Sequence, residues 1–280
     1  TRRVIAMGFF NRLKTGWALT KDSIRVLRGD PELAVFPLVG SVAGLLYVAL
    51  LLVPGFFLAS SDIGVLQYVL LFVLYFGSTF IASFTTAALM HETRKAFRGE
   101  EPSFKSGISA AWRNKGTLLA WSAVSATVGV IIQLIDSQDN FLAEILASII
   151  SVGWSILTYF VIPVITFEDV GVRGAIARSG ETFKNTWGET AGATFGVGIV
   201  TILFILPVAL LAVGIVVLGG LGGGALGLGG ALLVAASLLF VAYIFTATLG
   251  SIARLALYVY ATDGERPSAF EDVDLGRVPE

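Results

Sequence analysis

Long runs of apolar residues dominate the chain, and shorter polar or basic segments separate them. Crossing about 30 Å of hydrocarbon takes roughly 20 apolar residues in a helix. A transmembrane β-strand would instead be about ten residues of alternating polarity. The pattern therefore predicts an all-α polytopic membrane protein, a single domain over residues 1–280, with six transmembrane helices at residues 34–58, 66–90, 117–135, 141–167, 191–218 and 226–260.

The composition agrees with this class and removes several kinds of chemistry. Hydrophobic residues make up 55% of the chain and charged residues 14%, which lies outside the range of soluble proteins. The chain has no cysteine and one histidine, which excludes disulfide scaffolds, thiolate metal sites and sites that need two histidines. A net charge of −1 excludes a basic nucleic-acid binder. We therefore expect no enzyme activity, no metal and no cofactor.

The basic residues indicate the orientation in the membrane. Of the 19 Lys and Arg, seven precede the first span, six lie between spans two and three, three lie between spans four and five, and three lie at or after the end of the sixth span. The other loops contain none. By the positive-inside rule, the protein is a multi-pass cell-membrane protein with both termini in the cytoplasm.

The long basic loops and short outer loops divide the chain into three units. Each unit is predicted to be a cytoplasmic amphipathic elbow helix followed by a helical hairpin, and each elbow carries one tryptophan beside basic residues: Trp17, Trp112 and Trp187. Residues 1–33 are the first elbow, an interfacial helix that ends at Gly29-Asp30-Pro31, and residues 261–280 form a cytoplasmic tail.

The elbows are the predicted binding surface. In the first, apolar residues recur at steps of three and four and cations flank them, which is typical of a helix lying in the headgroup layer. Such a helix either orients the protein or recognises a lipid, anionic in character, or a partner protein. The residues expected to bind a lipid or a partner are Arg12, Lys14, Trp17, Lys21, Arg25, Arg28, Trp112, Arg113, Lys115, Lys184 and Trp187.

Three ionisable residues lie near the cytoplasmic ends of the predicted spans. Arg254 could pair with Glu168 or Glu92, so the three are predicted to form an ion-pair cluster; the alternative for Arg254 is a contact with a substrate. His91 precedes Glu92, but a lone histidine supplies one metal ligand, and no HExxH spacing follows it.

Hydroxyl and small residues form stripes along spans two, three and four. They either let helices approach closely or line a polar route for a solute. The stripes are Thr79, Ser83 and Thr86; Ser122, Ser125, Gly129 and Gln133; and Ser148, Ser151, Ser155 and Thr158. A run of eight glycines within residues 219–230 favours a tight outer turn, with a flexible gate as the alternative.

Several segments resemble an uncharacterised family of six-span archaeal, mostly haloarchaeal, integral membrane proteins, a domain of unknown function. They are Gly16-Trp17-Ala18-Leu19, Leu27-Arg28-Gly29-Asp30-Pro31-Glu32-Leu33, Arg98-Gly99-Glu100 and Tyr258-Val259-Tyr260-Ala261-Thr262. The resemblance implies membership and an archaeal source, and it implies no activity.

The sequence is compatible with three functions. The first is a non-enzymatic membrane protein whose basic elbows bind lipid headgroups or a partner protein. The second is a transporter or channel for a small or lipid-like solute. The third is an intramembrane enzyme, for which Glu92, Glu168 and Arg254 are the candidate groups.

Overall fold

The fold is that of a computed structural model of the 280-residue chain. The structure describes residues 2–59, 64–138, 140–185, 187–222, 224–264 and 270; within them, the side chains of residues 2–15, 53, 54, 56–59, 64, 187–197, 199 and 200 are not described. These residues form helices and contain no strand.

The helices follow one another with short connections. In chain order they are α1 (Arg2–Gly29), the short 3-10 helix η1 (Pro31–Ala34), α2 (Val35–Ala59), α3 (Gly64–Phe97), α4 (Phe104–Arg113), α5 (Lys115–Asp136), α6 (Phe141–Leu157), α7 (Val161–Phe167), α8 (Val172–Asn185), α9 (Trp187–Gly222) and α10 (Gly224–Asp263).

Six stretches of helix are long and apolar enough to cross a membrane. They are Pro31–Leu52, Val65–Phe97, Lys115–Asp136, Phe141–Phe167, Thr201–Gly222 and Gly224–Asp263, with mean hydropathies between 1.9 and 3.0. This confirms the prediction of an all-α chain with six helices suited to a multi-pass membrane protein.

α1 ends at the boundary that the sequence predicts for the first helix. α1 ends at Gly29, Asp30 adopts a non-helical φ of −128°, and Pro31 begins η1. Proline is tolerated in the first turn because that turn's N–H groups have no intrahelical partner. The chain then turns from α1 into the first long apolar helix.

The fourth predicted span is not one helix. Residues 158–160 form a turn between α6 and α7. Pro163 has no N–H to bond the carbonyl of Tyr159, which weakens the ladder at this point. Within the turn, the N–H of Phe160 donates to the hydroxyl of Ser179 in α8, at 2.9 Å. The span Phe141–Phe167 therefore consists of two helices joined by a turn at residues 158–160.

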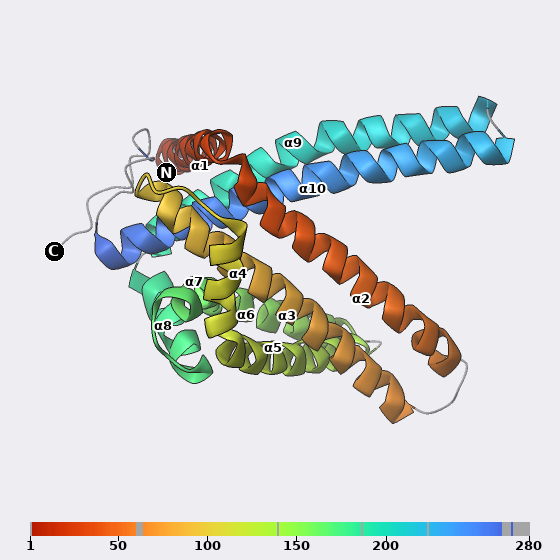
Figure 1. Cartoon of the computed structure of the whole chain (residues 1–280), viewed down its shortest axis with the longest axis horizontal. Helices are drawn as coiled ribbons and strands as arrows, with labels where there is room; N and C mark the ends of the chain where they lie inside the picture. The colour runs from red at the N-terminus through yellow and green to blue at the C-terminus, as the bar shows by residue number, and fades with distance from the viewer. Residues whose placement is uncertain are drawn as a thin grey trace.

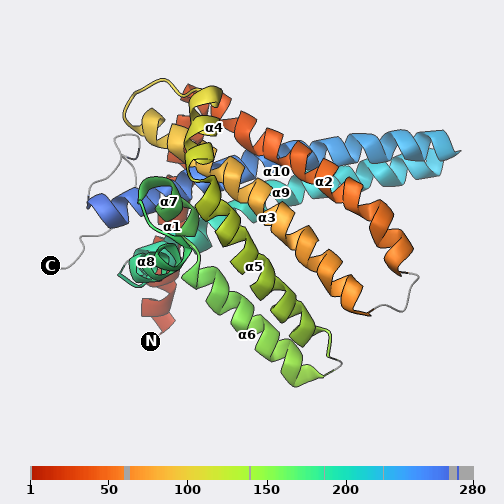
Figure 2. The same cartoon turned by 60° about the horizontal axis from the view of Figure 1, so that its bottom comes forward.

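The long helices form two bodies. α2, α3, α5 and α6 pack into one layer, through the α2–α3, α3–α5 and α5–α6 contacts, while α9 and α10 lie side by side and diverge from α2 (Figures 1 and 2). We call the α9–α10 pair the arm. α1, α4, α7 and α8 gather at one end of the molecule, called the elbow end below (Figure 1).

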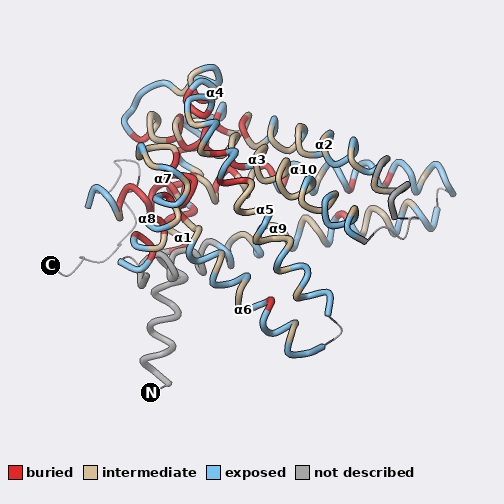
Figure 3. Tube along the Cα trace, turned by 90° about the horizontal axis from the view of Figure 1, so that it is seen from below, coloured by how far each residue is buried: buried red, intermediate tan, exposed pale blue. Residues whose placement is uncertain are grey.

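The buried core lies at the elbow end (Figure 3). Phe36, Phe160, Ile252 and Leu255 are among its fully enclosed side chains. Away from this end the apolar helices are uncovered: Leu226, near the tip of the arm, is 92% exposed. Such a surface is stable only where hydrocarbon replaces water.

Small residues bring the two helices of the arm together. A Cβ atom on Gly219 would lie 2.4 Å from the Cβ of Ala231 and 2.8 Å from the carbonyl oxygen of Gly227. α9 ends at Gly222 and α10 begins at Gly224, where φ is +56°, so the glycine run makes the expected tight turn. The two backbones come close at Gly219 and Gly227, where a Cβ atom on Gly227 would lie 3.0 Å from the carbonyl oxygen of Gly219.

Candidate functional site

α1 buries a stripe that the sequence pattern did not single out. Leu19, Asp22, Ser23 and Val26 are buried where α1 packs on α9 and α10. Trp17, which belongs to the predicted apolar face, is 59% exposed. α1 is therefore packed on the protein, and its predicted apolar face does not simply rest in lipid. The hydrophobic pattern of the sequence does not reveal this buried stripe because two of its residues, Asp22 and Ser23, are polar.

A buried carboxylate positions one of the cations of α1. Asp22 is fully buried, and one of its oxygens lies 3.0 Å from the guanidinium of Arg25, whose side chain is half exposed. The pair spans one helical turn. It holds Arg25 at the edge of α1 that faces the arm. In the sequence, an Asp three residues before an Arg looks like an ordinary surface pair, so nothing indicated that Asp22 is buried.

A hollow of about 350 Å³ lies between α1, α9 and α10. Three exposed cations of α1, Lys21, Arg25 and Arg28, line one side of it. Phe204 of α9 and Phe245 of α10 line another side, with ring centroids 5.3 Å apart. The remaining lining residues are Trp17, Thr20, Ile24, Thr201, Thr246 and Leu249.

Among the described residues that line this hollow, the charged ones are all cations. Two of its hydroxyls are already engaged within their own helices: Thr20 donates to the carbonyl of Gly16 at 2.8 Å, and Thr246 donates to that of Ala242 at 2.9 Å. The hollow thus combines a positive rim with an aromatic wall. A ligand suited to it has a negative group next to an apolar part.

α4 and the start of α5 present an aromatic residue and cations at a different place. Trp112 is 58% exposed, and the Nζ of Lys115 lies 4.3 Å from its ring centroid. Phe84 packs edge-on against Trp112, with ring centroids 6.2 Å apart. Arg113 is exposed beside them. This is a cation–π pair on the surface of α4 and the start of α5.

The structure brings together some of the predicted binding residues and separates others. Trp17, Lys21, Arg25 and Arg28 share one hollow, whereas Trp112, Arg113, Lys115 and the exposed Lys184 do not line it. The side chains of Arg12, Lys14 and Trp187 lie outside the described residues.

Glu92 of α3 connects this helix to α4 through hydrogen bonds. It is fully buried and accepts hydrogen bonds from the backbone N–H of Ser103 at 2.6 Å, the Nζ of Lys95 at 3.1 Å and the hydroxyl of Ser106. Ser103 is the N-cap residue of α4, and its own side chain makes no capping bond. The carboxylate of α3 therefore takes over the capping role at this helix start.

Glu168 belongs to a different network. The hydroxyl of Tyr258 in α10 donates to one of its oxygens at 2.7 Å, and the Nε of Arg178 in α8 lies 3.5 Å from the other. Glu168 and Glu181 together raise the pKa of Arg178 above its ordinary value, because both carboxylates favour its charged form. Glu168 thus links the end of α7 to α8 and α10.

Arg254 is not part of the Glu92 or the Glu168 network as the structure describes them. Among the described residues it forms no ion pair with Glu92 or Glu168; its guanidinium lies 4.9 Å from the ring centroid of Tyr159. Tyr159 occupies this place because the turn between α6 and α7 carries it there. The expected cluster of Glu92, Glu168 and Arg254 is therefore replaced by two carboxylate networks and a cation–π contact.

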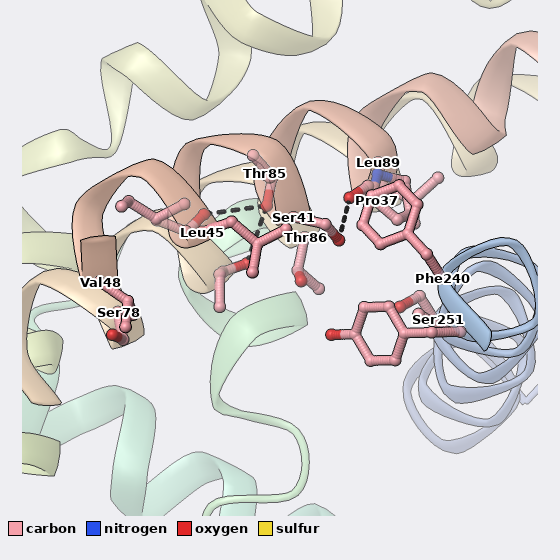
Figure 4. Close-up of a pocket in the computed structure, with 16 residues that line it drawn as sticks. Pro37, Ser41, Leu45, Val48, Ser78, Thr85, Thr86, Leu89, Phe240 and Ser251 are labelled. Carbon is pink, nitrogen blue, oxygen red and sulfur yellow. Dashed lines mark hydrogen bonds between the residues drawn. The ribbon is translucent and has the colours of Figure 1, made fainter. Parts of the chain in front are cut away.

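A second cavity, of about 430 Å³, lies between α2, α3 and α10. Ser41, Thr86 and Ser251 surround it with hydroxyls (Figure 4). Ser41 donates to the carbonyl of Pro37 at 2.6 Å, and Thr85 donates to that of Ile81 at 2.9 Å. Of the predicted hydroxyl stripes, the cavity includes Thr86 of α3 and takes no residue from α5 or α6.

One of the predicted stripes is used for close packing. A Cβ atom on Gly129 of α5 would lie 2.8 Å from the ring of Tyr75 in α3. Ser122 of the same stripe is fully buried and donates to the carbonyl of Leu118 at 2.8 Å. In the part of the chain that the structure describes, no group of three or more His, Cys, Asp or Glu residues is placed to hold a metal ion.

Comparison with known proteins gives a family. A model described as a family of unknown function, DUF6159, matches residues 65–268. The chain belongs to this family. The DUF6159 match runs from α3 to α10, so it covers the aromatic wall of the hollow on α9 and α10 but leaves out α1, which carries the three cations. No curated protein matches the chain.

Proposed function

We propose that this DUF6159 protein crosses the membrane six times, with its termini and its elbow end in the cytoplasm. The six apolar helices support this, as does the distribution of all 19 Lys and Arg in the sequence. α1, α4 and α8 supply the proposed elbows. Along the chain, each of the three precedes a pair of long apolar stretches, so the proposed repeat is an elbow followed by a hairpin.

The proposed function is non-enzymatic binding of anionic lipid headgroups at the cytoplasmic surface. The observation that carries it is the hollow in which Lys21, Arg25 and Arg28 face an aromatic wall. Each Lys or Arg near an anionic membrane surface contributes about 1 kcal/mol to binding. Guanidinium groups can also bond two phosphate oxygens at once. Trp17 suits the interface, where aromatic residues with a polar edge concentrate.

The other elbows supply further headgroup contacts in this proposal. Trp112 with Lys115 presents the same pairing of an aromatic ring and a cation, and Arg113 and Lys184 are exposed. A protein partner with an acidic surface is the other occupant that the sequence allows for these cations. Identifying what co-purifies with the protein distinguishes a lipid from such a partner.

The test is native mass spectrometry in mild detergent. A triple variant with Lys21→Gln, Arg25→Gln and Arg28→Gln removes the three cations of the hollow. The matched control, Arg98→Gln, Lys105→Gln and Arg173→Gln, removes three exposed cations that do not line it. We expect the first variant to lose at least tenfold in retained phosphatidylglycerol and the control to lose less than twofold. Equal loss in both, or no loss in either, contradicts the proposal.

A second proposal is transport of a lipid-like solute, and the hydroxyl-lined cavity between α2, α3 and α10 favours it (Figure 4). Its test is exchange of fluorescent phosphatidylglycerol between the leaflets of reconstituted liposomes. Ala247→Trp narrows this cavity, whereas Ala236→Trp lies on the exposed surface of the same helix, outside it. Transport through the cavity predicts that only Ala247→Trp slows the exchange; equal rates in both variants exclude this path.

A further inference from the structure

An apolar groove of about 620 Å³ runs along the arm. Val208 of α9 and Val234, Leu238 and Val241 of α10 are among its lining residues. Among its described lining residues the polar one is Ser237, whose hydroxyl donates to the carbonyl of Leu233 at 2.8 Å. The groove therefore offers a hydrocarbon surface to whatever occupies it.

The groove is continuous with the hollow beside α1. Phe204 and Phe245 line both, and their rings lie against each other. On one side of this aromatic pair are the three cations of α1, and on the other side the lining is apolar. Charge and hydrocarbon are thus separated along one surface, in the order in which a phospholipid carries them.

The length of the groove fits one leaflet. From Phe245 to Val234 the helix advances by eleven residues, which is about 16 Å at roughly 1.5 Å per residue. Half of a hydrocarbon core of about 30 Å is about 15 Å. A hydrocarbon chain lying along the arm would therefore reach from the headgroup region to about the middle of the bilayer.

We infer that the hollow and the groove form one binding site for a whole anionic lipid. The phosphate of the lipid lies at Lys21, Arg25 and Arg28. The lipid's hydrocarbon chain bends past Phe204 and Phe245 and then follows the arm toward Val234. Three cations favour a headgroup with net negative charge over a zwitterionic one, whose own cation they repel. This inference rests on the proposed headgroup function and adds the requirement that the lipid carries a long hydrocarbon chain.

The experiment fills the groove without touching the cations. Ser237→Trp and Val234→Trp place a bulky ring in it at exposed positions, where the change need not disturb the core. Leu239→Trp is the matched control, because it is exposed on the same helix and does not line the groove. Each variant, checked for unchanged elution and helix content, is delipidated and titrated with dioleoyl phosphatidylglycerol in native mass spectrometry.

Three probes separate the parts of the lipid. Dioleoyl phosphatidylcholine keeps the chains and loses the net charge, and glycerophosphoglycerol keeps the charged headgroup and loses the chains. We expect the parent protein to bind phosphatidylglycerol at least tenfold more tightly than either, and the two groove variants to lose at least tenfold of that affinity. Leu239→Trp should bind as the parent does.

The outcomes distinguish this inference from the function on which it rests. If both groove variants bind phosphatidylglycerol as well as the parent, while replacement of the three cations by glutamine abolishes binding, the headgroup function stands and the chain site is overturned. If the glutamine variant also binds unchanged, the headgroup function fails at this hollow. Equal affinity of the parent for phosphatidylglycerol and phosphatidylcholine overturns the inferred preference for net charge.

Discussion

At the scale of single residues, three carboxylates organise the elbow end. Glu92 caps α4 from a neighbouring helix, Asp22 orients Arg25, and Glu168 receives the hydroxyl of Tyr258. The hydrogen bonds that Glu92 and Glu168 accept are partly buried, and an unpaired buried polar group costs about 1–3 kcal/mol. Glu92 therefore links α3 to α4, and Glu168 links the end of α7 to α10, whereas Asp22 acts within α1.

Removing the Glu92 carboxylate should loosen α4. Glu92→Ala leaves the N–H of Ser103 and the ammonium of Lys95 without this acceptor, so we expect a loss of about 3 kcal/mol in the free energy of unfolding. The measurement is thermal unfolding in detergent, followed by tryptophan fluorescence. Glu100→Ala, an exposed acid in the same connection, is the control. If the two variants melt at the same temperature, Glu92 does not have this role.

The carboxylate of Asp30, unlike that of Glu92, is expected to lower the stability of the fold at neutral pH. Burial raises its pKa, and the charges of Glu32 and Glu101 raise it further. A raised pKa means that the folded state holds the proton more tightly, so this residue adds stability as pH falls through the folded pKa and opposes folding at neutral pH.

Asp30→Asn should therefore raise the stability at pH 7, by up to about 0.5 kcal/mol. The gain should disappear below pH of about 4, near the ordinary pKa of aspartate, where the parent residue is protonated too. Melting temperatures of parent and variant between pH 7 and pH 3.5 test this. A difference that stays constant over that range would show that the charge is not the cause.

The sequence allowed only part of the residue-scale picture to be predicted. Trp17, Lys21, Arg25 and Arg28 could be grouped because they repeat along one helix, and they do share a hollow. Arg254 could not be placed, because its neighbour Tyr159 depends on a break that lies in another helix pair. Phe204 and Phe245 carried no signal either, since in an apolar run a pocket-lining phenylalanine looks like a lipid-facing one.

At the scale of elements, Pro163 and Pro207 show why helix number was predictable and helix continuity was not. Pro207 lies inside the uninterrupted α9, while Pro163 accompanies the break between α6 and α7. Neither proline has a backbone N–H to donate to the helix. The difference is tertiary, because at the break the hydroxyl of Ser179 in α8 accepts a hydrogen bond from the N–H of Phe160. Apolar length alone predicts a span, but the partner that stabilises a break lies elsewhere in the chain.

The closest packing in the arm gives a prediction for its two helices. Gly219→Ala places a methyl group 2.4 Å from the side chain of Ala231, so α9 and α10 must move apart and the melting temperature should fall. Gly214→Ala, in the same helix, meets nothing within 4 Å and should be neutral or slightly stabilising, because alanine favours the helix. Equal effects at the two positions would mean that the contact at Gly219 is unimportant.

At the scale of the whole molecule, the proposed orientation can be tested directly because the chain has no cysteine. Gln138→Cys places a thiol in the turn after α5, and Arg98→Cys places one between α3 and α4. With cytoplasmic elbows, a membrane-impermeant maleimide should label Gln138→Cys in intact cells and should label Arg98→Cys only after permeabilisation. The reverse pattern would place the elbows outside.

The arm is joined to the rest of the protein near its base. From Thr248 onward α10 contributes to the shared core, whereas Leu233 is 72% exposed and Leu226 is 92% exposed. In the proposed membrane topology the arm is a cantilever, fixed at the elbow end, and lipid supports its free length. Its tilt is then set jointly by the packing of α1 at the base and by the thickness and lateral pressure of the bilayer.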